Sequence, residues 1–193
     1  MSKNVLVIGT GTIGEPLIGL LAEHKESLGL DKVIFFKRTP LSEERGKVEA
    51  LLRKGAEIVS TNDALSEFHQ LGFNEIKDVE LAYEDSDVII DCTPSGNDNW
   101  EKIYSLLSKD KRFMAQGSEH GFGPFFAWGI NNEILKDESN KFLIASCNTH
   151  NIASIVKAFA LDQQRDLLEG KFVCLRRAND VSQNDSFSPS PTI

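Results

Sequence analysis

The chain has 193 residues, of which 40% are hydrophobic and 26% are charged, so it is long and apolar enough to bury a core. Its formal net charge is -8. This acidic balance argues against a broad surface for nucleic acid or anionic membrane, and we expect neither as a partner.

No segment of the sequence indicates export or insertion into a membrane. The first apolar run, Val5–Ile8, is too short for a signal sequence and leads into glycines. No stretch approaches the roughly 18 apolar residues of a membrane span. We therefore expect a cytoplasmic protein.

The three cysteines, Cys92, Cys147 and Cys174, are far apart and lack the spacing of a disulfide framework or a zinc site. We expect no metal site. At least two of the thiols are expected to fill buried space as small apolar groups.

Short apolar runs alternate with helical patterns along the chain. The predicted strands are Val5–Ile8, Val33–Phe36, Ala56–Val59, Val88–Asp91, Arg112–Ala115, Lys141–Ala145 and Phe172–Leu175. The predicted helices are Glu15–His24, Ser42–Lys54, a short one within Thr61–Asn74, Trp100–Leu107 and Asn151–Asp162. This alternation predicts an α/β fold of the Rossmann type, a doubly wound and mostly parallel sheet covered on both faces.

The residues Gly9-Thr10-Gly11-Thr12-Ile13-Gly14 match the dinucleotide-binding pattern GxGxxG between a strand and a helix. Gly9 permits the tight turn, Gly11 lets the backbone approach a pyrophosphate, and Gly14 lets the helix pack on the strand. The helix start supplies N–H groups to the anion. The alternative is a glycine-rich turn that binds no ligand.

The end of the second predicted strand, Phe36-Lys37-Arg38-Thr39, carries no carboxylate to accept from a ribose 2′-hydroxyl. Lys37 and Arg38, with the Thr39 hydroxyl, are instead suited to a 2′-phosphate. We therefore expect NADP or NAD as the cofactor, with NADP favoured. The alternative is that these residues are solvated loop charges.

Cys147 lies between a predicted strand and a predicted helix. Helix N–H groups lower the pKa of a thiol at such a junction, and the same donors stabilise an oxyanion formed when sulfur attacks a carbonyl. From chemistry alone, an inert buried cysteine is as good an interpretation.

The chain resembles the amino-terminal portion of the archaeal-type (type II) glyceraldehyde-3-phosphate dehydrogenases. The segments that carry the resemblance keep the order and approximate spacing of that family. They are Gly9–Gly14, Lys37-Arg38-Thr39-Pro40, Asp91-Cys92-Thr93-Pro94-Ser95-Gly96, Gln116-Gly117, Ser146-Cys147-Asn148-Thr149 and Arg176-Arg177-Ala178. The Ser-Cys-Asn-Thr segment after a Rossmann domain is the most specific of them.

The resemblance assigns roles to individual residues. It implies that Thr12 and Ile13 contact cofactor phosphate through the backbone, that Thr93 contacts the cofactor, and that Gly117 lies beside the nicotinamide. It also implies a domain boundary: residues 1–145 bind NAD(P), and residues 146–193 begin an α+β catalytic domain.

The resemblance also implies the substrate site. Cys147 would be the nucleophile, and Ser146, Asn148 and Thr149 would hold the substrate. Arg176 and Arg177 would bind substrate phosphate or cofactor, although adjacent strand residues point to opposite faces and only one is expected to reach the site. The alternative is that both arginines are surface charges.

The implied reaction is the phosphorylating oxidation of glyceraldehyde 3-phosphate to 1,3-bisphosphoglycerate through a Cys147 thioester, with inorganic phosphate as the second substrate. The family's general-base histidine lies beyond residue 193, and none of His24, His69, His120 and His150 is expected to replace it. We therefore expect a fragment that is inactive alone, from a protein that the resemblance makes a tetramer. The alternatives are an NAD(P)-binding or redox-sensing module without turnover, and a related semialdehyde dehydrogenase.

Overall fold

The computed structural model describes residues 3–94, 96–116, 121–136, 138–161 and 167–174. In these ranges eight strands form one sheet in the order β4-β3-β2-β1-β5-β6-β8-β7, and every neighbouring pair is parallel. The strands are β1 (Lys3–Ile8), β2 (Leu30–Phe36), β3 (Glu57–Ser60), β4 (Lys77–Asp78), β5 (Val88–Asp91), β6 (Arg112–Gln116), β7 (Phe125–Phe126) and β8 (Lys141–Ile144).

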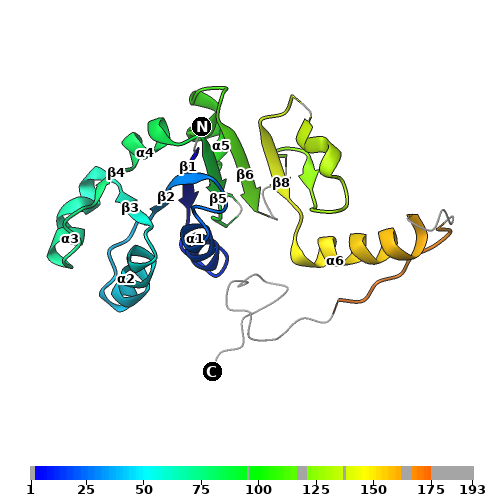
Figure 1. Ribbon diagram of the computed structural model, residues 1–193, viewed down its shortest axis with the longest axis horizontal. Coiled ribbons are helices and arrows are strands. Elements are labelled where there is room, and N and C mark those ends of the chain that lie inside the picture. Colours follow the sequence, from blue (N-terminus) through cyan, green and yellow to red (C-terminus); the bar gives the residue numbers. More distant parts are fainter. Residues whose placement is uncertain (1–2, 95, 117–120, 137, 162–166, 175–193) are drawn as a thin grey trace.

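Helices follow most of the strands and lie on both sides of the sheet (Figure 1). The α-helices are α1 (Gly14–Glu23), α2 (Arg45–Arg53), α3 (Leu65–Gln70), α4 (Val79–Asp85), α5 (Asn99–Lys102) and α6 (Cys147–Val156). The shorter turns are the 3-10 segments η1 (Ser42–Glu44), η2 (Asn62–Ala64), η3 (Tyr104–Leu106) and η4 (Asn132–Lys136), and the π segment η5 (Lys157–Leu161).

The order of the strands reverses at β1. The chain builds outward from β1 through β2, β3 and β4, and then returns to place β5 on the other side of β1. In open parallel sheets such a reversal opens a crevice at the carboxyl ends of the strands, where ligands bind. The topology therefore points to the carboxyl ends of β1 and β5.

The two faces of the sheet bury separate apolar clusters. On one face Val5, Val7 and Phe35 pack against residues of α1, α2 and α3. On the other face Leu6 and Ile34 pack with residues of α4, η3 and β6. Successive residues of β1 thus alternate between two cores, which is why the strand reads as an uninterrupted apolar run.

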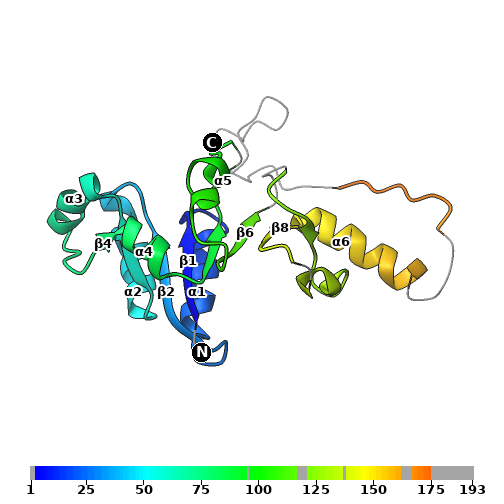
Figure 2. The same ribbon diagram turned by 90° about the horizontal axis from the view of Figure 1, so that it is seen from above.

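The last described α-helix, α6, lies apart from these two cores. None of its residues is buried. Figures 1 and 2 both show it running away from the sheet after β8. Helices α1 to α4 therefore pack on the sheet through buried residues, whereas α6 does not.

The predicted α/β fold with a parallel, doubly wound sheet is confirmed. The sequence interpretation missed α4 and the two-residue strands β4 and β7. Val79, Ala82 and Tyr83 of α4 are buried. The helix has only seven residues, and charged residues separate its apolar ones, so its apolar pattern is too short to indicate a helix.

Two predicted helix boundaries and one predicted strand were wrong. The helix predicted over Trp100–Leu107 breaks at Ile103, where the backbone leaves the helical region and turns Tyr104 into the core. The helix predicted from Asn151 begins at Cys147, because Ser146 caps it. Phe172 to Cys174 form no strand, since none of the described strands pairs with them, and Val173 is 87% exposed.

The turn between β1 and α1 depends on two glycines. Gly9 has φ +97°, and a Cβ there would lie 3.2–3.3 Å from the backbone of Cys92 and Thr93. A Cβ on Gly14 would lie 1.9 Å from the carbonyl oxygen of Gly9. By contrast, a Cβ on Gly11 would meet nothing within 4 Å. Packing within the chain therefore requires glycine at positions 9 and 14 but not at 11.

We expect Gly14→Ala to lower the free energy of unfolding by about 3 kcal/mol, because its methyl group forces α1 away from β1. Gly11→Ala is the matched control and should change that free energy by less than about 0.5 kcal/mol. Urea unfolding followed by circular dichroism measures both. Equal destabilisation by the two substitutions would contradict this packing account.

Candidate functional site

The parallel sheet gathers the candidate residues on one edge. β1 ends at the glycine turn, β2 ends before Lys37, β5 ends before Thr93, and β8 ends before Cys147. β8 is three positions from β1 in the sheet, which is roughly 14 Å at the usual strand spacing. The glycine turn and the cysteine thus lie at the same edge, far enough apart for an extended ligand.

The first turn of α1 leaves its amino-terminal amides without a side-chain cap. Ile13 is the N-cap residue and makes no capping hydrogen bond, and both Thr12 and Ile13 are exposed. Uncapped N–H groups and the positive end of the helix dipole favour an anion at this position. The structure therefore brings together the predicted residues Gly9, Gly11, Thr12, Ile13 and Gly14.

A cavity of about 470 Å³ opens beside the glycine turn. Its walls come from the ends of β1 and β2, from α4 and from the loop after β5, and include Thr10, Arg38, Tyr83 and Thr93. The volume is in the range of cofactor and ligand sites. Thr93, predicted from the family resemblance, thus faces the same cavity as the glycine turn.

The two predicted basic residues have different environments. Lys37 is only 6% exposed, and its Nζ donates a hydrogen bond to Oε2 of Glu44 in η1. Arg38 and Thr39 are exposed and line the same cavity. The accessible cation is therefore Arg38. The sequence interpretation missed Glu44. The pair of acidic residues Glu43 and Glu44, in the segment after β2, is the sequence feature that could have indicated it.

Asp91, at the end of β5, is a buried carboxylate with four donors. Its Oδ1 accepts from the Thr93 N–H at 2.8 Å and the Thr93 hydroxyl at 2.6 Å. Its Oδ2 accepts from Asn99 Nδ2 at 2.7 Å and the Tyr104 hydroxyl at 2.8 Å. Such donors offset the cost of burying the charge. The network fixes the loop after β5 and positions Thr93.

The charge of Asp91 also acts on its neighbours. Burial, and then Asp91, raise the pKa of the Cys92 thiol to about 12. The same two causes raise the pKa of Tyr104. Cys92 lies under the glycine turn, and its Sγ is 3.7 Å from Gln116 Nε2. Cys92 therefore stays protonated at neutral pH and serves as packing.

Cys147 is the first residue of α6, and it is exposed. Cys174 is also exposed, so the expectation that at least two thiols fill buried space was wrong. The helix begins here because the Ser146 hydroxyl accepts from the Thr149 N–H at 3.3 Å. Cys147 is thus an accessible thiol in the first turn of a helix, as the chemistry of a nucleophile requires.

The other residues of this segment are partly engaged. The hydroxyls of Ser146 and Thr149 are 2.9 Å apart and hydrogen-bonded to each other as part of the cap. Asn148 is half-buried. His150 Nε2 lies 2.9 Å from the carbonyl oxygen of Trp128 and ties the start of α6 to the segment before β8. Both Ser146 and Thr149 therefore have a structural role in addition to any contact with substrate.

Some predicted residues cannot be placed. Gly117, Arg176, Arg177 and His120 lie outside the described residues. His24, the residue after α1, and His69 of α3 are exposed on the surface, as expected. Within the described ranges no cluster of His, Cys, Asp and Glu is arranged to hold a metal ion, and no helix is both long and apolar enough to cross a membrane.

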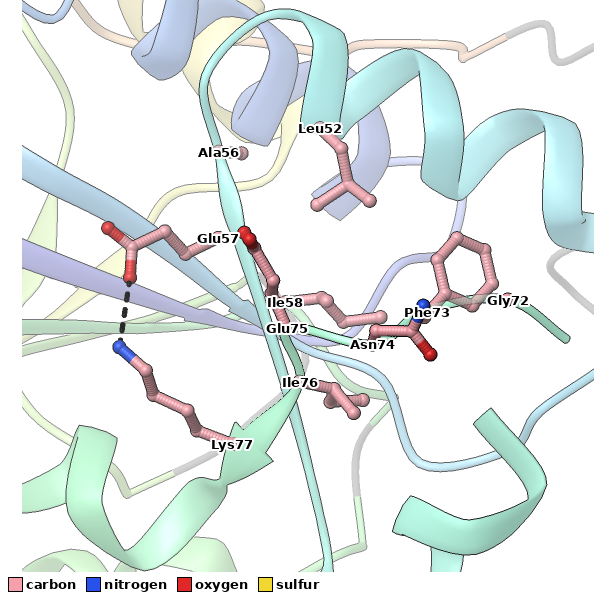
Figure 3. A pocket seen from close by; sticks show the side chains of 10 residues that line it. All are labelled: Leu52, Ala56, Glu57, Ile58, Gly72, Phe73, Asn74, Glu75, Ile76 and Lys77. Atoms are coloured by element: carbon pink, nitrogen blue, oxygen red, sulfur yellow. Dashed lines mark ion pairs between the residues drawn. The ribbon is translucent and has the colours of Figure 1, made fainter. Parts of the chain in front are cut away.

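A larger cavity, of about 950 Å³, lies elsewhere in the described part of the chain (Figure 3). It opens at the amino ends of β3 and β4, and Figure 3 shows Leu52, Ile58 and Ile76 in its walls. At its rim Lys77 Nζ lies 3.8 Å from Glu57 Oε2. This hollow is at the edge of the sheet opposite to the glycine turn, so it belongs to neither the predicted cofactor site nor Cys147.

The chain is similar to archaeal glyceraldehyde-3-phosphate dehydrogenases, although no family model matches it. It is 27% identical over 181 residues to the glyceraldehyde-3-phosphate dehydrogenase of Sulfolobus acidocaldarius, covering 93% of this chain and 50% of the relative. The enzyme of the same name from Methanobrevibacter smithii is 26% identical over 185 residues, covering 94% of this chain and 52% of the relative.

Among solved structures, aspartate semialdehyde dehydrogenase II from Vibrio cholerae aligns with a TM-score of 0.48 and 12% identity, covering 81% of this chain and 46% of that one. That likeness is too low to indicate a function. The chain spans about half the length of the curated relatives that it matches. The predicted resemblance is confirmed: the chain is similar, over most of its length, to the amino-terminal portion of archaeal glyceraldehyde-3-phosphate dehydrogenases.

Proposed function

We propose that this chain supplies the cofactor domain and the nucleophile of an NAD(P)-dependent dehydrogenase that oxidises glyceraldehyde 3-phosphate to 1,3-bisphosphoglycerate with inorganic phosphate. One observation carries the proposal: the glycine turn and the exposed Cys147 lie at the same carboxyl edge of one parallel sheet. Residues 1–145 form the cofactor domain, and residues 146–193 begin the catalytic domain. The exposed α6 supports this division.

The residues at the glycine turn fit a dinucleotide. Packing within the chain does not require a glycine at position 11, since a Cβ there would touch nothing. Close approach of a pyrophosphate to the backbone would require one. The uncapped start of α1 suits the same anion. The ribose end of the cofactor extends toward Arg38 and Thr39, whose exposed donors favour the 2′-phosphate of NADP over NAD.

Cys147 carries the covalent chemistry. Its thiolate attacks the aldehyde carbon, and the N–H groups at the start of α6 stabilise the oxyanion of the resulting thiohemiacetal. When bound, a nicotinamide would supply the hydride acceptor needed to oxidise this carbon to the thioester level. A phosphate oxygen then attacks the thioester, and the thiolate departs as the acyl phosphate forms. Asn148 and Thr149 adjoin the reacting carbon, and one of the two arginines Arg176 and Arg177 binds phosphate.

The exposure of Cys147 bears on turnover. An acyl-transfer site must exclude water, because a thioester hydrolyses and electrostatic stabilisation weakens in solvent. The described residues leave Cys147 open, so closure of the site falls to residues other than these. We propose that residues 1–193 alone bind the cofactor without turning substrate over. A cytoplasmic location and a tetrameric assembly belong to the same proposal.

Arg38→Gln should weaken NADP binding about 10- to 100-fold and leave NAD binding within about twofold, since a hydrogen bond to a charged group contributes roughly 1.5–3 kcal/mol. Isothermal titration calorimetry with each cofactor measures both affinities. Arg53→Gln, at an exposed arginine on α2, is the matched control. Tighter binding of NAD than of NADP by the unaltered chain would contradict the NADP preference.

The full-length polypeptide should form NAD(P)H from glyceraldehyde 3-phosphate only when inorganic phosphate is present. Cys147→Ser should abolish this activity, because a hydroxyl is a far weaker nucleophile than a thiolate, while cofactor affinity is retained. Cys174→Ser, at another exposed thiol, should retain activity. Turnover of aspartate semialdehyde but not of glyceraldehyde 3-phosphate would move the proposal to a semialdehyde dehydrogenase. Undiminished activity of Cys147→Ser would refute the mechanism.

A further inference from the structure

The ion pair between Lys37 and Glu44 stands at the end of β2, where a dinucleotide-binding fold selects its cofactor. The position of Lys37 is fixed by the neighbouring strand: its N–H donates to the Val59 carbonyl at 3.0 Å, and its carbonyl accepts from the Ser60 hydroxyl at 2.7 Å. With its backbone held and its ammonium buried, Lys37 anchors the half-buried carboxylate of Glu44.

The anchored carboxylate borders the same cavity as the glycine turn. Glu44, Gly9, Thr10 and Arg38 all line it, and Glu44 and Thr10 also line a smaller hollow toward α1. Glu44 therefore lies between the turn that suits a pyrophosphate and the end of β2. This is where a carboxylate accepts a hydrogen bond from the 2′-hydroxyl of the adenosine ribose in sites that bind NAD.

We propose that Glu44 is a second specificity-determining residue of the cofactor site, which acts against the NADP preference of Arg38: held by Lys37, its carboxylate accepts the ribose 2′-hydroxyl of NAD. The proposal rests on the proposed cofactor function. An ionised carboxylate has about four acceptor positions, and Lys37 Nζ uses one, so capacity for the ribose remains. Glu44 thereby supplies, from the segment after β2, the carboxylate that the strand end itself lacks.

The same pair limits the affinity for NADP. Glu44 neutralises Lys37, and a 2′-phosphate would approach a second carboxylate as well, since Glu80 of α4 lines the cavity. Arg38 is the exposed cation that opposes these two carboxylates. Removing the charge of Glu44 therefore removes a repulsion and releases Lys37 toward the phosphate, while NAD loses its acceptor.

Glu44→Gln should weaken NAD binding about tenfold and strengthen NADP binding at least threefold, measured by isothermal titration calorimetry with each cofactor. Glu43→Gln makes the same change of charge at the adjacent exposed residue, whose carboxylate accepts from Ser42. This control should leave the ratio of the two affinities within twofold of that of the unaltered chain. An unchanged ratio in Glu44→Gln would overturn the proposal.

The double substitution Lys37→Gln with Glu44→Gln keeps the local net charge and leaves no unpaired buried ammonium. It should lose NAD affinity as the single substitution does, without the gain for NADP, because Lys37 is no longer present to meet the phosphate. NAD affinity equal to that of the unaltered chain would show that Glu44 does not contact the ribose. If the unaltered chain binds neither cofactor, the proposed function itself fails, whatever the variants do.

Discussion

Helix α1 packs so closely on β1 that position 14 has no room for a side chain, since a Cβ there would overlap the carbonyl oxygen of Gly9. This contact sets the direction in which α1 leaves the sheet. It also brings the exposed, uncapped start of the helix over the carboxyl end of β1. The geometry of the candidate site therefore depends on the close contact between the backbones of Gly14 and Gly9. Gly11 takes no part in this contact.

Two carboxylates, Asp91 and Glu44, fix the groups on either side of the glycine turn. Asp91 gathers Thr93, Asn99 and Tyr104 on one side of the glycine turn, and Lys37 holds Glu44 on the other. A buried charge is stable only when it is paired or well supplied with hydrogen bonds. Each of these charges therefore fixes the groups around it, which gives the edge a defined shape before any ligand binds.

The fold was largely predictable from the sequence because its central strands contain short apolar runs that glycines and helical patterns separate. The glycine turn and the start of the helix at the cysteine also follow from local chemistry. The role of Lys37 did not: its pairing with Glu44 depends on how the segment after β2 folds back over the strand end. A sequence pattern reports the charge of Lys37 but not its burial.

Tyr104 illustrates the same limit. Its segment has the composition of a helix, yet the helix breaks at Ile103 and the hydroxyl reaches Asp91. Tertiary contacts of this kind override local propensity. By contrast, the helix of Cys147 begins four residues earlier than predicted because Ser146 caps it, and a serine at that position is a local signal that the sequence contains.

We infer above all that the carboxyl edge at the glycine turn is a dinucleotide site. Amide chemical shifts of nitrogen-15-labelled protein, followed while NADP is added, test this most directly. We expect the largest changes at Gly11, Thr12 and Thr93, with the amides of Glu57 and Lys77 unmoved. Changes concentrated at Glu57 and Lys77, beside the larger cavity, with the glycine turn unmoved, would contradict it.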